Sequence, residues 1–156
     1  AARVHQCDCL RARGTSVMVG LPDAPGPTRD VYNAPYWDGL ADHRLVMPRC
    51  EQCGHVLFPM RPVCTQCFSD SLQWVELSGR GTVWGYCVYH HAFHPAFVEQ
   101  LPYNVSMIEL EEGPMLVSNV VGVALEALNT GLCVAAFFDD REDGATLLRF
   151  RAVSDA

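Results

Sequence analysis

Two Cys-x-x-Cys pairs separated by ten residues constrain the fold of this chain more than any other feature. The pairs are Cys50 with Cys53 and Cys64 with Cys67. Each pair places two thiolates on one tight turn, and two such turns can close a tetrahedral four-sulfur shell around Zn²⁺. Gly54 follows the first pair and suits the positive φ that these turns often need, whereas Phe68 follows the second pair. The spacing therefore predicts a metal-binding ribbon.

Structural zinc is the favoured interpretation of these four cysteines. Disulfides are an alternative, but the amino terminus shows no signal-peptide pattern, and ribbon-spaced pairs in an intracellular chain are more often metal ligands. Iron in a rubredoxin-like site is a second alternative, which would make the chain a one-electron carrier. Because four protein ligands leave no open position for water, we expect the metal to be structural and not catalytic.

Charge and hydropathy argue against nucleic-acid binding and against a membrane span. The chain has 156 residues and a formal net charge of -7, and all 11 of its basic residues are arginine. Nucleic-acid affinity comes largely from neutralised phosphates, so an acidic chain without a basic run is a poor candidate and this remains a minor alternative. No stretch approaches the roughly 18 apolar residues of a membrane span. We therefore expect a soluble cytoplasmic protein.

The amino-terminal part contains one segment with a regular pattern. Residues 1–30 are predicted to be a flexible leader, because prolines and glycine interrupt any regular element. Residues 31–44 are predicted to hold a short amphipathic helix, with Pro35 at its first helical position. Its Tyr36 and Trp37 could pack on the chain's own core or anchor a partner, since such aromatics are enriched at interface hot spots.

The remainder is predicted to be mainly β. Residues 45–77 form the zinc ribbon, in which residues 45–49 and 55–60 flank the first cysteine pair as a small hairpin. Residues 78–156 alternate in hydropathy between glycines, with a short helical connection at 122–129. The expected strands are 80–90, 103–110, 114–121, 131–138 and 146–152. Five strands of this length fit a small closed barrel of the OB type, which leaves no exposed edge.

Taken in order, these motifs resemble one family, the rubredoxin-like zinc ribbon fused to an OB barrel that is catalogued as the thirty-fifth family of domains of unknown function. The matching features are the helix at 34–40, Cys50-x-x-Cys53, Phe58-Pro59-x-Arg61-Pro62-x-Cys64-x-x-Cys67, Ser78-Gly-Arg-Gly-Thr82, Phe93-His-Pro-Ala-Phe97, the turn at 109–113 and residues 148–151. The resemblance covers roughly residues 30–153. It implies an accessory subunit that docks on a thiolase-like partner, such as a sterol side-chain aldolase, in a hetero-oligomer. A hotdog-fold enoyl-CoA hydratase is the alternative partner.

The resemblance also implies a role in holding or passing on a CoA thioester. The candidate contacts to partner or acyl-CoA are Tyr36, Trp37, Phe93, His94 and Phe97. The last three lie on the connection between the first two barrel strands, which borders the usual ligand face of an OB barrel. Arg49, Arg61 and Arg80 could meet CoA phosphates, for which arginine's forked donors are well shaped, or could form solvated surface pairs.

No independent catalytic apparatus is predicted. Cys87 and Cys133 lie in expected apolar strands, where a small buried thiol explains them better than a nucleophile does. A histidine of the loop could act as a general base, but a solvent-facing or partner-packed imidazole is the more ordinary interpretation. The sequence therefore predicts a non-catalytic subunit.

Overall fold

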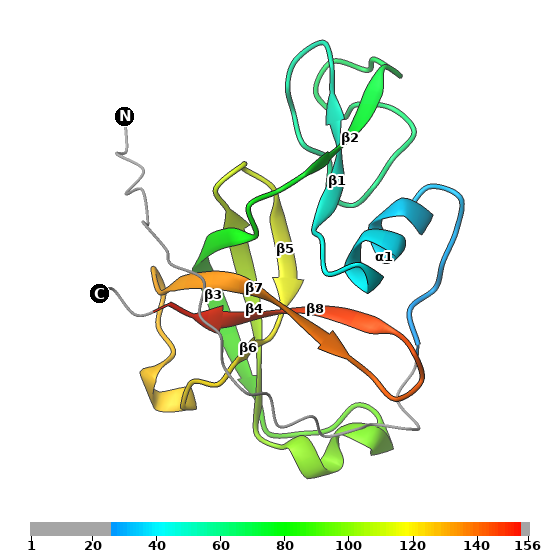
Figure 1. Ribbon diagram of the computed structural model, residues 1–156. Helices are drawn as coiled ribbons and strands as arrows, with labels where there is room; N and C mark the ends of the chain where they lie inside the picture. Colours follow the sequence, from blue (N-terminus) through cyan, green and yellow to red (C-terminus); the bar gives the residue numbers. More distant parts are fainter. Residues whose placement is uncertain (1–25, 154–156) are drawn as a thin grey trace.

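The computed structural model describes residues 26–153, so most of the predicted leader lies outside the described residues. A small two-stranded ribbon stands at one end of the molecule and a barrel at the other, with the one α-helix of residues 26–153 beside their junction (Figure 1). The fold is mainly β with an amino-terminal helix, a zinc ribbon and an OB-type barrel, as predicted. Within the described part, no helix is long and apolar enough to cross a membrane.

Helix α1 (Ala34–Ala41) packs closely on the first ribbon strand, β1 (Val46–Cys50). Asn33 occupies the N-cap position and a proline lies in the first turn, where its missing N–H is not needed. Gly39 faces β1, and a Cβ there would lie 2.5 Å from Cγ2 of Val46. Glycine is therefore required at this position so that the helix and the strand can meet.

The ribbon pairs β1 with a distant strand, β2 (Leu72–Glu76), in antiparallel register from Val46 opposite Glu76 to Cys50 opposite Leu72. The small hairpin predicted between residues 45–49 and 55–60 is present but short: it is the single antiparallel bridge of Arg49 with Val56, with the N–H of Cys50 bonded to the carbonyl of His55 and that of Leu57 to the carbonyl of Pro48, both at 2.8 Å. The returning segment contains Pro59, which has no N–H to donate to a ladder, whereas β2 is free to pair along all of β1.

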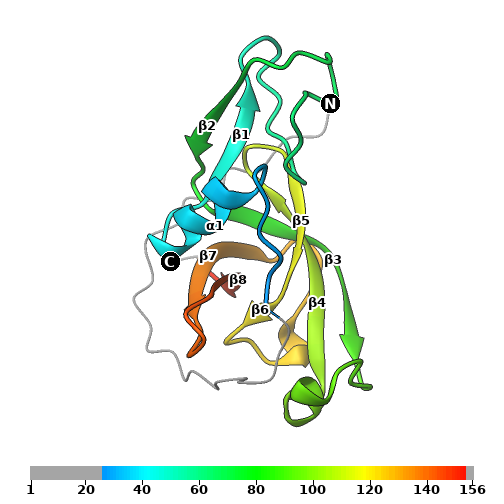
Figure 2. The same cartoon turned by 90° about the vertical axis from the view of Figure 1, so that its right-hand side faces the viewer.

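The barrel has six strands and two short 3₁₀ turns. They are β3 (Arg80–Tyr89), η1 (Pro95–Gln100), β4 (Tyr103–Leu110), β5 (Met115–Ser118), β6 (Val120–Val121), η2 (Leu125–Ala127), β7 (Cys133–Asp140) and β8 (Thr146–Ala152). The sheet order is β5-β4-β3-β7-β8-β6, antiparallel except for β6 beside β8. Because only Asn119 separates β5 from β6, their pairing with β4 and β8 respectively closes the sheet (Figure 2). This one bent strand makes the five-stranded barrel of an OB fold.

Asn104 of β4 closes the barrel seam with its side chain. Its Nδ2 donates to the carbonyl of Val120 at 2.7 Å, and its Oδ1 accepts the N–H of Val120 at 2.9 Å and the hydroxyl of Ser106 at 3.0 Å. Asn119 donates in turn to the carbonyl of Asn104. The buried amide thus replaces a missing ladder pair between β4 and β6.

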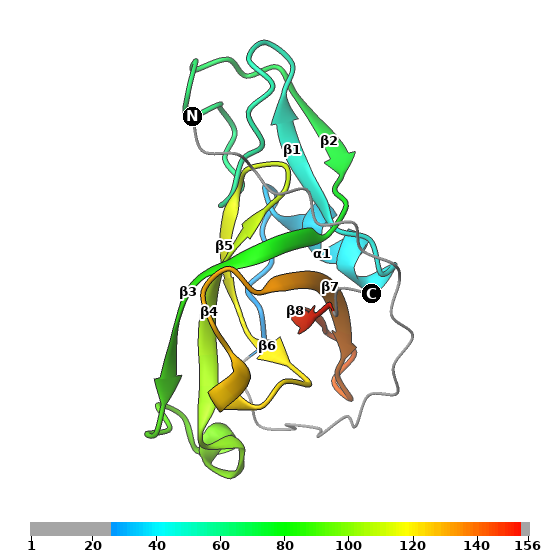
Figure 3. The same ribbon diagram turned by 90° about the vertical axis from the view of Figure 1, so that its left-hand side faces the viewer.

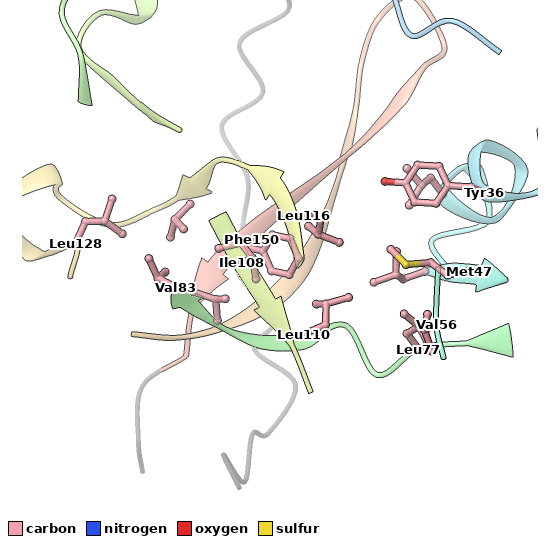
Figure 4. Packing of buried hydrophobic residues seen from close by; sticks show 14 residues of the cluster. Tyr36, Met47, Val56, Leu77, Val83, Ile108, Leu110, Leu116, Leu128 and Phe150 are labelled. Atoms are coloured by element: carbon pink, nitrogen blue, oxygen red, sulfur yellow. The ribbon is translucent and has the colours of Figure 1, made fainter. Parts of the chain in front are cut away.

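One apolar core runs through helix, ribbon and barrel. Figure 4 shows Tyr36, Met47, Val56 and Leu77 at one end of the cluster and Leu128 and Val83 at the other, with Leu110 and Leu116 between them. Because all of these residues belong to one packed cluster, the ribbon packs against the barrel and does not form a separate module.

Replacing Asn104 by Ala should lower the free energy of unfolding by about 2–4 kcal/mol, because two buried backbone groups of Val120 lose their partner. Urea denaturation of the zinc-loaded protein measures this loss. Asn129→Ala is the matched control, since Asn129 is exposed and bonds only its own turn. A loss no larger than the control's would contradict the role of Asn104 as the seam closure.

Candidate metal centre and binding groove

The four cysteines of the ribbon converge on one point. The sulfurs of Cys50, Cys53, Cys64 and Cys67 all lie within 4.8 Å of one another, and two of the pairs are 3.5 Å apart. A zinc–sulfur bond of about 2.3 Å in tetrahedral geometry separates the sulfurs by about 3.8 Å, whereas a disulfide requires about 2.05 Å. The arrangement fits a metal shell and excludes disulfides among these four cysteines, as predicted.

The pKa shifts of the four thiols also favour a bound cation. The pKa of Cys50 is lowered to about 7, chiefly by the backbone N–H of Cys53. Burial raises the pKa of Cys64, but N–H groups of its own turn lower it by more. At Cys53 and Cys67 a backbone N–H lowers the pKa, but burial and the neighbouring sulfurs raise it further. Four thiolates this close therefore need a divalent ion to remain deprotonated together.

The donor set fits structural zinc. All four ligands come from the protein, so the shell has no position for water or substrate. Zinc held there supplies folding free energy and cross-links the two knuckles. Cys50 and Cys64 are buried in one cluster with Leu57, while Cys53 and Cys67 are exposed.

A groove of about 570 Å³ lies between α1, the ribbon and the barrel. Its walls come from α1, residues 58–60, η1, β4, β5 and β8. The groove overlies a seam in the barrel, because β5 pairs only with β4 in the described sheet and the first half of β8 only with β7. One hydrogen bond bridges the seam, from the hydroxyl of Ser118 to the carbonyl of Leu148 at 2.8 Å.

Polar groups are few in the groove and most are already paired. Arg149, which is 16% exposed, donates from Nε to Asp139 at 2.5 Å and from Nη1 to Asn119 at 2.7 Å. The indole Nε1 of Trp37 is buried and has no hydrogen-bond partner within the described residues. Burial also raises the pKa of Tyr36, so this wall stays neutral. An apolar ligand with one or a few acceptor groups suits such a lining.

The five residues predicted to contact a partner or acyl-CoA lie in different places in the structure. Tyr36, Trp37 and Phe97 line the groove together, although Tyr36 is only 8% exposed and packs mainly on the core. Phe93 is 75% exposed at the tip of the β3–β4 connection. His94 is the N-cap of η1, where its Nδ1 accepts the N–H of Ala96 at 3.2 Å, so it has a structural role.

The three predicted phosphate contacts also differ. Arg80 is engaged with Glu111, with Nε 3.0 Å from the carboxylate. Arg49 donates to the carbonyl of Gly54 at 3.2 Å, and Arg61 is exposed. Among the described residues, neither Arg49 nor Arg61 forms an ion pair with a carboxylate. Arg49 and Arg61 are therefore better candidates than Arg80 for a contact with CoA phosphates.

Sequence reasoning missed the barrel side of the groove. Val117, Leu148 and Arg149 are wall residues that lie on ordinary strands, and no local signal marks them as part of a groove. The expectation of buried thiols was wrong, since Cys87 is exposed and Cys133 is half-buried. Cys87 lies on the part of β3 that extends beyond the barrel core, where both faces of the strand are accessible.

Comparison with known proteins identifies both modules. Residues 37–73 match the family described as "ChsH2, rubredoxin-like zinc ribbon domain", and residues 74–139 match "ChsH2, C-terminal OB-fold domain". A solved structure described as an "Ltp2-ChsH2(DUF35) aldolase" aligns with a TM-score of 0.74 and 36% identity, covering 81% of this chain and 98% of that chain.

Two curated relatives differ in how much of them this chain covers. A "DUF35 domain-containing scaffold protein" of Methanocaldococcus jannaschii is 37% identical over 64% of this chain and 74% of its own length. A "Probable enoyl-CoA hydratase alpha subunit" of Thermomonospora curvata is 37% identical over 81% of this chain. The chain spans only 39% of that subunit's length.

Replacing Cys50 by Ser should remove zinc and unfold the ribbon, because metal affinity in such a small module is folding free energy. Zinc content by mass spectrometry and a circular dichroism melt measure the two effects. Cys87→Ser is the matched control, since Cys87 is an exposed cysteine outside the shell. A Cys50 variant with stoichiometric zinc and an unchanged melting temperature would exclude a structural metal.

Proposed function

Because the chain belongs to the ChsH2 family of zinc-ribbon and OB-fold proteins, we propose that it is a non-catalytic accessory subunit. It docks on a thiolase-like partner, of the lipid-transfer-protein thiolase or aldolase type, and helps to bind an acyl-CoA thioester. The observation that carries this proposal is the likeness to the Ltp2-ChsH2(DUF35) aldolase over nearly the whole of that chain. The scaffold protein among the relatives supports the same role.

The geometry of the two sites favours an accessory role over catalysis. The metal shell consists of four cysteines and leaves the ion no free coordination position. His94 is the loop histidine that was predicted as a contact. Its Nδ1 already accepts a hydrogen bond from the N–H of Ala96 at the start of η1. The chemistry would then belong to the partner, and this chain would contribute positioning.

The tip of the β3–β4 connection is the proposed docking contact. Phe93 and Val98 are 75% and 57% exposed there. The ring of Phe93 is nevertheless held in place, edge-on to Tyr89 at 5.4 Å and to His91 at 5.5 Å. An exposed aromatic that is already ordered loses little entropy on binding, which suits an interface anchor.

The groove is the proposed site for the acyl or pantetheine part of the thioester. Its volume lies within the range of about 300–1,000 Å³ that is usual for ligand pockets. A carbonyl of the ligand could satisfy the unpaired indole N–H of Trp37. Arg49 and Arg61 on the ribbon are the proposed contacts for the CoA phosphates.

A hydratase is the second candidate partner. The support is the relative described as an enoyl-CoA hydratase alpha subunit, although this chain spans only 39% of that protein. The docking surface and the groove would serve either partner, so the identity of the retained chain decides between them.

Affinity purification of the tagged protein from its native lysate should retain a thiolase-like chain in near-equal amount, identified by mass spectrometry. Phe93→Ala should weaken this association at least about tenfold, the effect of removing a hot-spot aromatic. The melting temperature should hardly change, because the ring is mostly exposed.

Tyr32→Ala is the control for this variant, since Tyr32 is a half-exposed aromatic beside α1. Recovery of the chain alone would overturn the accessory role. Recovery of a hydratase-like chain would establish the second candidate, and equal retention by the Phe93 variant would remove the loop tip from the interface.

Replacing Val117 by Asp should weaken binding of a long-chain acyl-CoA at least about tenfold, because it places a charge in the apolar groove. Isothermal titration of the zinc-loaded protein measures the change. Val31→Asp is the matched control, since Val31 is also exposed but lies outside the groove. Equal affinity of the two variants would exclude the groove as the ligand site.

A further inference from the structure

The two metal knuckles share one backbone geometry. The N–H of Gly54 donates to the carbonyl of Cys50 at 2.9 Å, and the N–H of Phe68 donates to that of Cys64 at 3.0 Å. The N–H of each leading cysteine is also bonded in the same way, to the carbonyl five residues later at 2.8 Å. Positions 54 and 68 are therefore equivalent in structure.

The same position holds opposite residues in the two knuckles. Gly54 has φ 74° and Phe68 has φ 60°, both in the left-handed region. Glycine adopts this region freely, but a side chain with a Cβ is strained there, and a bulky one is a genuine outlier. Phe68 is thus unfavourable where glycine or asparagine would complete the turn.

Packing within the chain does not offset this strain. The Phe68 side chain is 80% exposed, and Val63 nearby in the sequence is 42% exposed. Both residues belong to the outer end of the ribbon, together with the exposed ligands Cys53 and Cys67. The hydrogen bonds of the knuckle hold the backbone of position 68 at this φ, so what the chain itself does not explain is the exposed aromatic ring, and a side chain kept at such a cost is a signal of function.

We propose that Phe68 is a second anchor, which inserts into an apolar pocket of the thiolase-like partner and covers the exposed half of the metal shell. This inference rests on the proposed function and adds a contact at the opposite end of the molecule. Figure 3 shows that the loop of residues 61–70 and the η1 connection lie at opposite ends and project toward the same side. One partner can therefore meet both.

Charge argues for this occupant over two others. The chain carries a net charge of -7, so a second copy or an anionic membrane would be repelled. At the outer end of the ribbon the exposed charges balance, with Glu51 and Asp70 against Arg49 and Arg61, so the repulsion comes from the net charge of the whole chain. A protein pocket with an apolar centre fits the surface better.

The decisive variant is Phe68→Asn, because asparagine tolerates the left-handed region and lacks the ring. Its melting temperature should rise by about 2–4 °C, since the strain is relieved. Its association with the retained thiolase-like chain should weaken at least about tenfold. A merely structural phenylalanine would lower both quantities together.

Two further variants serve as controls for the loss of the ring and for the change in the turn. Phe68→Tyr keeps the ring and should retain association within about threefold of the wild type. Gly54→Asn changes the equivalent knuckle, where a Cβ would make only ordinary contact with Arg49 at 3.6 Å, and should leave association unchanged. Zinc content is measured in all three variants so that a lost shell is not mistaken for a lost anchor.

The outcomes separate this inference from the proposed function. If the wild type retains the thiolase-like chain and Phe68→Asn retains it equally, only the anchor is overturned. If the wild type retains no such chain, the proposed function fails and the anchor fails with it. If Phe68→Asn changes the oligomeric state of the isolated protein in analytical ultracentrifugation, the occupant is a second copy and the proposal is overturned.

Discussion

The four-sulfur shell fixes one end of β1, and β1 is the element on which the rest of the structure depends. Cys50 at its carboxyl end lies in the small cluster under the metal, while Met47 in the same strand lies in the main core. Gly39 lets α1 approach this strand to contact distance. A change in the metal shell is therefore transmitted to the main core through β1 and through its neighbours in the ribbon, among them Val56 and Trp74.

The groove exists because the barrel is closed by side chains along part of its seam. Where a ladder would continue, Asn104 and Ser118 bond to backbone groups across the gap. Asn119 at the bend links this network to Arg149 and Asp139. Side-chain closure satisfies the buried polar groups and still leaves room above the seam, which a continuous sheet would fill with paired backbone.

The sequence predicted what depends on local pattern and missed what depends on distant pairing. The cysteine spacing and Pro35 were sufficient for the metal shell and the start of α1, because each acts within a few residues. The hairpin beside the first knuckle, predicted from local pattern, is a single bridge, whereas the long partner of β1 is β2, more than twenty residues away, which no local pattern pairs with it. The groove could not be foreseen, since its walls meet only when the barrel closes, and the burial of Tyr36 follows from the same event.

A rigid connection between ribbon and barrel has a consequence for recognition. Because one core joins them, the ribbon end and the β3–β4 tip keep a fixed separation and direction. A partner that contacts both ends meets a preformed surface, so binding need not order one module against the other. A flexible linker in this position would add an entropic cost to every association. The continuity of the core is thus what would let an accessory subunit hold a partner and a ligand in one orientation.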